Sequence, residues 1–372
     1  MKRHAEATLA GAGERMPAAT HPPDRREDVR LLIVDGERRS LSDRSFASFA
    51  DALAPGDLVV VNDAATLPAS LHGSIEPFGN PIELRLLGPL AEARDSDWRG
   101  VLFGAGDWRI DTDLRPAPPR LEPGTTLRFG TLRAELLARS SISPRLLELR
   151  FDREGAALWH ALYRQGRPIQ YSHLDAPLEL WSVQTLFAGR PWAIEMPSAG
   201  RPLTAASLVE LRRRGIGLAR LTHAAGLSAS GDPRIDAALP LPERYEIPQA
   251  SVDAIAETRA RGGRVIAVGT TVVRALESAA RGGELRAGAG VAELIVDADH
   301  RLQIVDALLT GMHGPGESHY RLLRAFADEP LLAEAWQRAR AAGYRSHEFG
   351  DAALLLPRRI GVARRLGARQ LQ

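Results

Sequence analysis

Two histidines in this sequence stand where a predicted strand ends and a loop begins. His313 lies in the run Leu309 to Ser318, whose glycine and proline residues prevent regular structure. His223 follows the apolar run Ile216 to Leu221. Histidine is the usual proton-transfer group near neutral pH. Both histidines are therefore candidate catalytic residues, and the alternative is that each bonds to nearby backbone and has only a structural role.

A third segment offers a site for an anion. Gly269, Thr270 and Thr271 follow the apolar run Val265 to Val268 and precede a predicted helix. The first N–H groups of a helix have no partner within the helix, and the helix dipole is positive there, so this end attracts anions. The two hydroxyls can hold a ligand carboxylate or cap the helix. Arg274, one turn further on, can add a salt link or lie on the surface.

Further candidate binding residues occur beside strand ends and turns. Asn62 and Asp63 end a buried apolar run, and Asp351 precedes another. Ser198 and Gly200 belong to a segment of small residues and prolines, which lets the backbone approach a ligand closely. A lone carboxylate such as Asp63 or Asp351 is also a common turn former.

The sequence argues against several other chemistries. It has no cysteine, so it offers no disulfide, no thiolate nucleophile and no cysteine-based metal site. No His-Glu-x-x-His motif is present, and His313 and His319 lack the i,i+4 spacing of a helical ligand pair. We therefore expect no metal. The Gly-x-Ser-x-Gly elbow of serine hydrolases and the Gly-x-Gly-x-x-Gly fingerprint of dinucleotide-binding domains are absent as well.

Length and composition indicate a globular protein of about two domains. The chain has 372 residues, of which 44% are hydrophobic and 25% charged. It contains no run of 18 apolar residues, so no transmembrane helix is predicted. The first 26 residues are polar and rich in proline, lack the apolar core of a secretory signal, and are expected to be ordered only in part. A cytoplasmic protein is expected.

The positive charge is nearly all arginine, since Lys2 is the only lysine, and the net charge is only +2. Arginine suits phosphate binding through its planar fork, although genomic base composition also explains its frequency. Arginines cluster at positions 212–214, 259–264, 358–359 and 364–365. These clusters permit contact with nucleic acid without requiring it.

The elements that must position the candidate residues follow from the alternation of apolar and polar residues. Five segments have the pattern of helices: Ala205 to Arg214, Val252 to Arg261, Thr271 to Arg281, Tyr320 to Ala327 and Leu331 to Ala342. Apolar runs of strand type include Arg30 to Val34, Leu58 to Val61, Ile216 to Leu221, Val265 to Val268 and Ile304 to Leu309. This pattern is typical of an α/β fold, which binds ligands at the carboxyl ends of its strands.

Residues 69–150 have a different pattern. Short alternating runs are separated here by proline and glycine: Ile82 to Leu87, Thr126 to Phe129 and Leu146 to Phe151. Many short strands with turns between them predict a small all-β barrel or sandwich. We therefore predict an α/β catalytic domain made of residues 1–68 and 151–372, interrupted by an inserted, barrel-like β domain of residues 69–150.

Taken together, these segments resemble the S-adenosylmethionine:tRNA ribosyltransferase-isomerase family of queuosine biosynthesis. The most specific stretch is Gly269 to Ala279, where the family has Gly-Thr-Thr-Ser-Val-Arg-Thr-Leu-Glu-Ser-Ala. Five other segments are similar to family motifs: Leu58 to Leu71, Gln184 to Ala188, Pro197 to Thr204, Leu308 to Ser318 and Tyr344 to Leu354. The resemblance covers most of the chain outside residues 1–20 and much of 70–150.

The resemblance implies an α/β domain with an inserted β-barrel and a defined reaction. The family transfers the ribosyl part of S-adenosylmethionine to a 7-aminomethyl-7-deazaguanine base in tRNA. The sugar is rearranged to give epoxyqueuosine, and adenine and methionine are released. S-adenosylmethionine is a co-substrate, and neither a metal nor another cofactor is implied. The expected partner is tRNA, no membrane contact is expected, and we expect a monomer or weak oligomer.

That reaction assigns roles to the candidate residues. A sulfonium acidifies the protons on its neighbouring carbon, so a base of modest strength can start the rearrangement, and adenine leaves more easily once it is protonated. His313 and His223 are candidates for these two steps in either order, and Asp351 is a third catalytic candidate. The methionine carboxylate is expected at the helix end that carries Thr270 and Thr271.

Further residues are predicted to bind the substrate. Arg274 is expected beside the methionine carboxylate. Ribose hydroxyls or the amino group are expected at Asn62, Asp63 or Asp351. The remaining predicted binding residues are Ser198, Gly200, Gly269 and Glu277.

The chain also departs from the family within its motifs. The family's Thr-Arg after Asn-Asp is Ala64-Ala65 here, and family histidines are missing from the segments at 201–204 and 240–243. These changes remove an arginine and two histidines that can bind phosphate or transfer protons. Two alternatives follow: an enzyme that uses S-adenosylmethionine with another acceptor, or a catalytically weak protein that binds S-adenosylmethionine or RNA.

Overall fold

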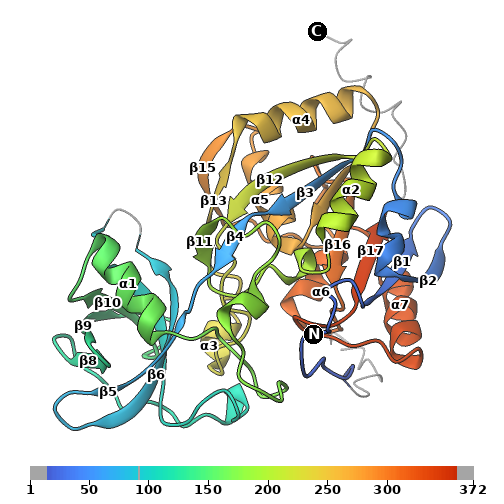
Figure 1. The fold of residues 1–372 in the computed structure, drawn as a ribbon. Coiled ribbons are helices and arrows are strands. Elements are labelled where there is room, and N and C mark those ends of the chain that lie inside the picture. The colour runs from blue at the N-terminus through green and yellow to red at the C-terminus, as the bar shows by residue number, and fades with distance from the viewer. Residues whose placement is uncertain (1–14, 91–92, 358–372) are drawn as a thin grey trace, which may run out of the picture.

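The structure is a computed structural model, and it describes residues 15–90 and 93–357. Within these ranges the chain forms a nine-stranded open sheet, a closed barrel of six strands and a two-stranded sheet between them. Figure 1 shows the barrel standing to one side of the large sheet. The two-stranded sheet pairs β4 (Ala64–Thr66) with β11 (Arg190–Ala193) in parallel. It lies where the chain leaves the large sheet for the barrel and where it returns.

The nine-stranded sheet is parallel at its centre. Its strands, from one edge to the other, are β15 (Gly288–Ala292), β13 (Glu243–Ile247), β12 (Gly217–His223), β3 (Leu58–Asn62), β14 (Val265–Val268), β16 (Ala307–Gly311), β17 (Ala352–Leu356), β1 (Arg30–Asp35) and β2 (Ser40–Ser45). The pairs β12–β3, β3–β14 and β14–β16 are parallel, whereas β17 runs antiparallel to β16. The carboxyl ends of four strands and the amino end of β17 therefore meet at one edge, which we call the site edge.

Helices cover both faces of this sheet, as its long apolar runs require. They are α2 (Ala205–Arg213), α4 (Gln249–Ala260), α5 (Thr270–Ala279), α6 (Ser318–Leu323) and α7 (Glu329–Ala341), together with the 3₁₀ helix η1 (Phe46–Ala52). Side chains from α4, α5, α6 and α7 pack on one face, and those from α2 and η1 pack on the other. Because successive residues of a strand point to opposite faces, each central strand contributes to both cores.

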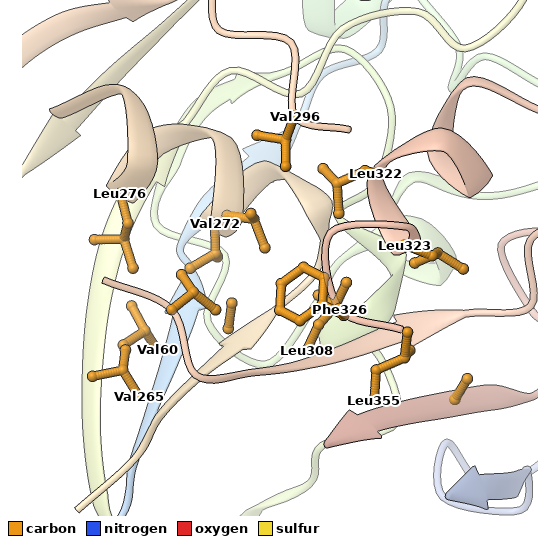
Figure 2. Close-up of a cluster of buried hydrophobic side chains, with 14 of the residues drawn as sticks. Val60, Val265, Val272, Leu276, Val296, Leu308, Leu322, Leu323, Phe326 and Leu355 are labelled. Carbon is orange, nitrogen blue, oxygen red and sulfur yellow. The ribbon is translucent and has the colours of Figure 1, made fainter. Parts of the chain in front are cut away.

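Apolar side chains pack between α5 and the sheet (Figure 2). Val272 and Leu276 of α5 lie over Val60 of β3 and Val265 of β14, and all four side chains are fully buried. At about 25 cal/mol per Å² of buried apolar surface, each such side chain stabilises the fold by roughly 1.5–3 kcal/mol. This packing fixes the amino end of α5 at the site edge.

The barrel is antiparallel throughout and has its own core. Its strands follow the order β10 (Leu146–Phe151), β7 (Asp97–Phe103), β6 (Asn80–Pro89), β5 (Ser70–Ile75), β8 (Thr126–Phe129) and β9 (Leu132–Arg139). Helix α1 (Gly155–Gln165) packs on this core, as does Ile235 of the short helix α3 (Pro233–Asp236). The remaining 3₁₀ segments are η2 (Thr112–Leu114), η3 (Leu180–Val183) and η4 (Ser198–Gly200).

The predicted fold class, an α/β sheet with an inserted barrel-like domain, is confirmed. The exact domain boundaries stay a prediction. All five predicted helices are present with shifted ends, whereas α1, β13 and β15 were not predicted. The strand expected over Ile304 to Leu309 is β16, which begins only at Ala307, because the N–H groups of residues 303–305 bond to a buried carboxylate instead of a strand.

Some predictions fall on other parts of the chain. The arginine clusters at 358–359 and 364–365 lie outside the described residues, as do the first 14 residues of the polar N-terminal segment. In the described part of the chain, no helix combines the length and the apolar character needed to cross a membrane.

Candidate functional site

Asn62 joins three elements at the site edge. Its amide nitrogen donates to the backbone oxygen of His223 at 2.9 Å and to the hydroxyl of Thr271 at 3.4 Å. Its side-chain oxygen accepts from the backbone N–H of His223 at 2.9 Å and of Ala64 at 3.0 Å. The buried amide therefore clamps the ends of β3 and β12 to the start of α5. The neighbouring Asp63 is half-buried and accepts from the Thr222 hydroxyl at 2.6 Å.

The amino end of α5 lies open at this edge. Gly269 has φ = 91°, a left-handed value that favours glycine, and no side chain caps the helix. A Cβ on Gly269 would lie 3.6 Å from the Cβ of Ala199, so η4, which carries Ser198 and Gly200, is packed against this helix end. Thr270 is buried and Thr271 is partly exposed. The predicted binding residues of η4 and α5 are thus brought together.

Arg201, at the end of η4, is an arginine whose charge has no acidic partner. The residue is only 5% exposed, and its guanidinium lies 4.9 Å from the centre of the Phe349 ring. Its one hydrogen bond goes to the backbone oxygen of Ser182 at 3.4 Å, and no carboxylate of the described residues pairs with it. Burial, with a smaller contribution from Arg26, lowers the pKa of Arg201 to about 10. A buried, unpaired cation is costly and therefore indicates an anionic ligand. Sequence reasoning missed this residue.

His313 occupies the loop after β16 and reaches solvent, with its side chain 21% exposed. Its Nε2 lies 3.1 Å from the hydroxyl of Thr310, and its Nδ1 lies 3.3 Å from a carboxylate oxygen of Glu317. Burial raises the pKa of Glu317, but the hydrogen bond and charge of His313, together with a backbone hydrogen bond, lower it by more, so the net shift is downward. A carboxylate, an imidazole and a hydroxyl in line form an arrangement suited to proton transfer.

His223 has the opposite surroundings. Its side chain is fully buried, and neither ring nitrogen has a hydrogen-bond partner. The nearest carboxylate oxygen, from Glu243, is 3.6 Å from Nε2. Burial, aided by the nearby charge of Arg274, lowers the pKa of His223 to about 3. This imidazole stays neutral and out of reach at neutral pH, which argues against the predicted role in proton transfer.

Arg274 is not free to bind a ligand in the way the sequence suggested. It is buried and forms an ion pair with Glu243, and it donates to the backbone oxygen of Ala292 at 2.8 Å. Burial lowers the pKa of Arg274 to about 10. Glu243 also accepts from the N–H of Gly226 at 2.5 Å. The charge of Arg274 is therefore paired inside the fold, because Glu243 of β13 lies beside it.

Glu277, a predicted binding residue, bonds to the backbone of its own fold. It is fully buried, and its carboxylate accepts from the N–H groups of residues 303–305 at 2.8–3.0 Å and lies 3.1 Å from His300. Both carboxylate oxygens are therefore hydrogen-bonded to the segment before β16. The buried carboxylate is not accessible to a ligand.

Asp351 lies at the site edge, but both of its oxygens are used. One accepts from the N–H of Arg30 at 2.7 Å, and the other accepts from the N–H of Arg345 at 2.8 Å and from the Arg30 guanidinium at 3.2 Å. These bonds hold the start of β1 beside the loop before β17. They argue against the catalytic role predicted for Asp351, because the carboxylate has no free face.

His319 lies against His313, and sequence reasoning assigned it no role. Its ring stacks on His313 with 4.7 Å between ring centres. Burial lowers the pKa of His319 to about 3, and the charges of His313 and Arg274 contribute to the shift. The imidazole beneath His313 is therefore neutral and serves as a flat support. Its contact with His313 arises from a loop that folds back on itself, which no spacing rule indicates.

Two cavities bear on the location of the site. One has a volume of about 460 Å³ and lies between the barrel and the linker after α1, lined by residues such as His72, Glu83, Trp108 and Gln170. The other, behind His313, measures only about 20 Å³ and is lined mainly by apolar side chains. The lining of the larger cavity includes neither Thr271 nor His313, so the candidate site rests on its side-chain chemistry.

Comparisons with known proteins agree on one family. The model of the family described as "Queuosine biosynthesis protein" matches residues 14–355. A protein of Anaeromyxobacter sp. (strain Fw109-5), named S-adenosylmethionine:tRNA ribosyltransferase-isomerase, is 37% identical over 344 residues, covering 91% of this chain and 94% of its own length. A protein of the same name from Trichlorobacter lovleyi is 32% identical, with 91% and 96% covered.

A solved structure is similar as well. It is the crystal structure of S-adenosylmethionine tRNA ribosyltransferase from Thermotoga maritima, which aligns with a TM-score of 0.51 and 26% sequence identity. The alignment covers 92% of this chain and 99% of the Thermotoga chain. The likeness therefore extends over both the large sheet and the barrel.

Proposed function

The chain belongs to the queuosine biosynthesis protein family, and we propose that it is an S-adenosylmethionine:tRNA ribosyltransferase-isomerase. It transfers the ribosyl part of S-adenosylmethionine to 7-aminomethyl-7-deazaguanine in tRNA and rearranges the sugar to give epoxyqueuosine, with release of adenine and methionine. The observation that carries this proposal is the match to curated enzymes of that name over 91% of the chain.

His313 is the residue to which we assign proton transfer. The reaction needs a base to remove a proton beside the sulfonium and an acid to protonate the departing adenine. His313 is accessible, and its two ring nitrogens lie within hydrogen-bonding distance of Thr310 and Glu317. Glu317 orients the imidazole through its contact with Nδ1. His223 supports neither step, because it is buried and neutral.

The methionine carboxylate is assigned to the open end of α5 and to Arg201. The helix end supplies N–H groups and a positive dipole, and Arg201 supplies a charge that no described carboxylate neutralises. The hydroxyl of Thr271 stands at the same end, held by Asn62. Arg201 thus replaces Arg274 in the proposed binding set. A guanidinium suits this ligand because it can bind a carboxylate through two parallel hydrogen bonds.

The proposal includes partners and setting. S-adenosylmethionine is the co-substrate and tRNA the acceptor, and the reaction itself needs no cofactor. We place the activity in the cytoplasm, where tRNA is modified, and propose a monomer or weak oligomer, since one chain supplies His313, Arg201 and the α5 end. The arginines at 212–214 and 259–264 lie near the opposite ends of the central strands, so they do not form part of the site edge.

Free adenine is the product that tests the function. The protein is incubated with S-adenosylmethionine alone, and with S-adenosylmethionine plus tRNA that carries 7-aminomethyl-7-deazaguanine. Adenine release that requires this tRNA, together with epoxyqueuosine in the tRNA digest, is the expected result. Release without tRNA would indicate another acceptor, and S-adenosylmethionine binding without any release would indicate a binding protein; either outcome contradicts the proposal.

A further inference from the structure

Three residues with metal-binding side chains meet at a place that the proposed reaction does not use. His173 belongs to the linker that follows α1, whereas His347 and Glu348 belong to the loop between α7 and β17. One ligand atom from each lies within 4.8 Å of those of the other two. The Nε2 of His173 is 3.1 Å from a carboxylate oxygen of Glu348, and the two imidazole rings stack with 4.2 Å between their centres.

We propose that His173, His347 and Glu348 form a binding site for a divalent transition metal, zinc being the best match. Two imidazoles and one carboxylate form a ligand set that zinc takes in proteins. Hard cations such as Mg²⁺ and Ca²⁺ prefer sites made of oxygen alone, so the two nitrogens disfavour them. Three protein ligands leave a tetrahedral ion one position for water.

The cluster is accessible to an incoming cation. His173 and Glu348 are half-buried, with side chains 15% and 21% exposed, and His347 is exposed, which leaves an entry path from solvent.

The backbone at His347 gives an independent indication. Its φ is 68°, in the left-handed region that residues other than glycine rarely adopt. Such a conformation costs on the order of 1–3 kcal/mol and persists where the surroundings or a ligand require it. An ion pair between His173 and Glu348 accounts for the positions of those two side chains alone. It leaves His347 in a strained backbone, with its ring stacked on another imidazole and without a side-chain hydrogen bond to any of the described residues. A shared metal ion accounts for all three residues.

This inference goes beyond the proposed function, because the transfer reaction does not require a metal. The cluster joins segments 175 positions apart in the sequence. The loop that contributes His347 and Glu348 continues into Phe349, beneath Arg201. A bound metal would therefore fix the linker from the barrel to the loop that supports the proposed carboxylate site.

The test uses the full chain after treatment with a chelator and its removal. Calorimetric titration with Zn²⁺ should give one ion per chain, and Co²⁺ should give the visible absorption bands of a four- or five-coordinate site. One equivalent of Zn²⁺ should also raise the thermal unfolding temperature. His173→Ala, His347→Ala and Glu348→Gln should each weaken Zn²⁺ binding by more than the ~10–100-fold typical of lost supporting residues.

Matched controls separate the cluster from other donors. His160→Ala changes an exposed histidine on α1, and Glu179→Gln changes an exposed carboxylate of the linker; both variants should bind Zn²⁺ like the unchanged chain. His347→Ala removes an exposed side chain, so it keeps the test valid even where His173→Ala fails to fold. Absence of stoichiometric binding, or equal binding by the cluster variants and the controls, would overturn the proposal. The calorimetric, spectroscopic and thermal measurements do not depend on transferase activity.

Discussion

The ends of β12 and β16 carry the same kind of residue at the same edge of the sheet, but they differ in what surrounds it. At the end of β12, His223 is fully buried beside the ion pair of Glu243 and Arg274. The two charges of that pair neutralise each other within the fold. After β16, His313 is accessible and lies between a hydroxyl and a carboxylate.

The difference shows what a strand-end histidine needs before it can transfer protons. Burial lowers the pKa of His223 to about 3, so it cannot hold a proton near neutral pH. His313 has solvent access, and a carboxylate oxygen of Glu317 lies 3.3 Å from its Nδ1. Position at the same edge of the sheet therefore does not make the two histidines equivalent, because burial and neighbouring groups differ between them.

The two arginines of the site edge differ in a parallel way. Arg274 has a buried acidic partner, whereas Arg201 has none among the described residues. A paired arginine stabilises the fold, and an unpaired one can hold a ligand. The four predictions that follow test these two contrasts.

The largest expected effect is on stability, from the β12 end. Arg274→Ala should lower the free energy of unfolding by about 3–5 kcal/mol, because it leaves the Glu243 charge buried without a partner. Urea unfolding measures this. The double variant Arg274→Met with Glu243→Gln removes both charges and should be clearly more stable than Arg274→Ala. Equal stability of the single and double variants would mean that the pair is not buried as described.

The next effect is on catalysis, from the β16 end. His313→Ala should lower the turnover of adenine release at least ~100-fold, since it removes the proposed proton-transfer group. The melting temperature should change little, because the side chain is partly exposed. His160→Ala, which changes an exposed histidine on α1, serves as the control. Turnover within a few-fold of the unchanged enzyme would remove His313 from the mechanism.

The third effect contrasts the unpaired arginine with an ordinary one. Arg201→Ala should raise the KM for S-adenosylmethionine ~10–100-fold with a smaller change in kcat, because a hydrogen bond to a charged group contributes about 1.5–3 kcal/mol. Arg212→Ala, an exposed arginine on α2, should leave the KM unchanged. If both variants behave alike in steady-state kinetics, Arg201 does not bind the carboxylate.

The smallest effect on activity is expected for His223→Leu. Turnover should stay within a few-fold, because the side chain touches no ligand in our assignment. The free energy of unfolding of this variant should depend less on pH than that of the unchanged chain. The pKa of His223 is 6.5 in the ordinary state and about 3 in the fold, so between these values only the unfolded chain binds the proton. Stability therefore falls as pH falls through this window, with a slope of up to about 1.4 kcal/mol per pH unit from this group.

Urea unfolding at pH 5 and pH 7 checks the last prediction. The unchanged chain should lose more stability between these two values than His223→Leu does. A large loss of turnover in a folded His223→Leu variant would reverse the comparison, because it would place the β12 end in the reaction.

Much of the framework could be predicted because it depends on local patterns. The fully apolar runs before Asn62 and Gly269, and the largely apolar run that ends at Leu309, predicted central strands of an α/β sheet, and neighbouring parallel strands end at one edge. The clustering of Asn62, Thr271, η4 and His313 at that edge follows from this geometry. The barrel was predicted from short alternating runs, because each of its strands has one buried face.

The individual roles of the site residues were harder to predict. Glu277 stands in the family-like segment of α5, and only the fold reveals that its carboxylate holds the backbone of residues 303–305. Asp351 is similarly occupied by Arg30 and Arg345. Arg201 was not recognised as a binding candidate from the sequence. Its missing acidic partner could be recognised only after every neighbouring carboxylate had been placed.

The sequence by itself determined the α/β sheet with its inserted barrel, the family and the sheet edge that carries the candidate residues, since these depend on periodicity and on motifs of consecutive residues. Only the tertiary structure decided which histidine is accessible, which arginine is unpaired, and that His173 meets His347 and Glu348. The physical reason is that burial and charge pairing depend on segments that lie far apart in the chain, and their distances are set when the cores pack.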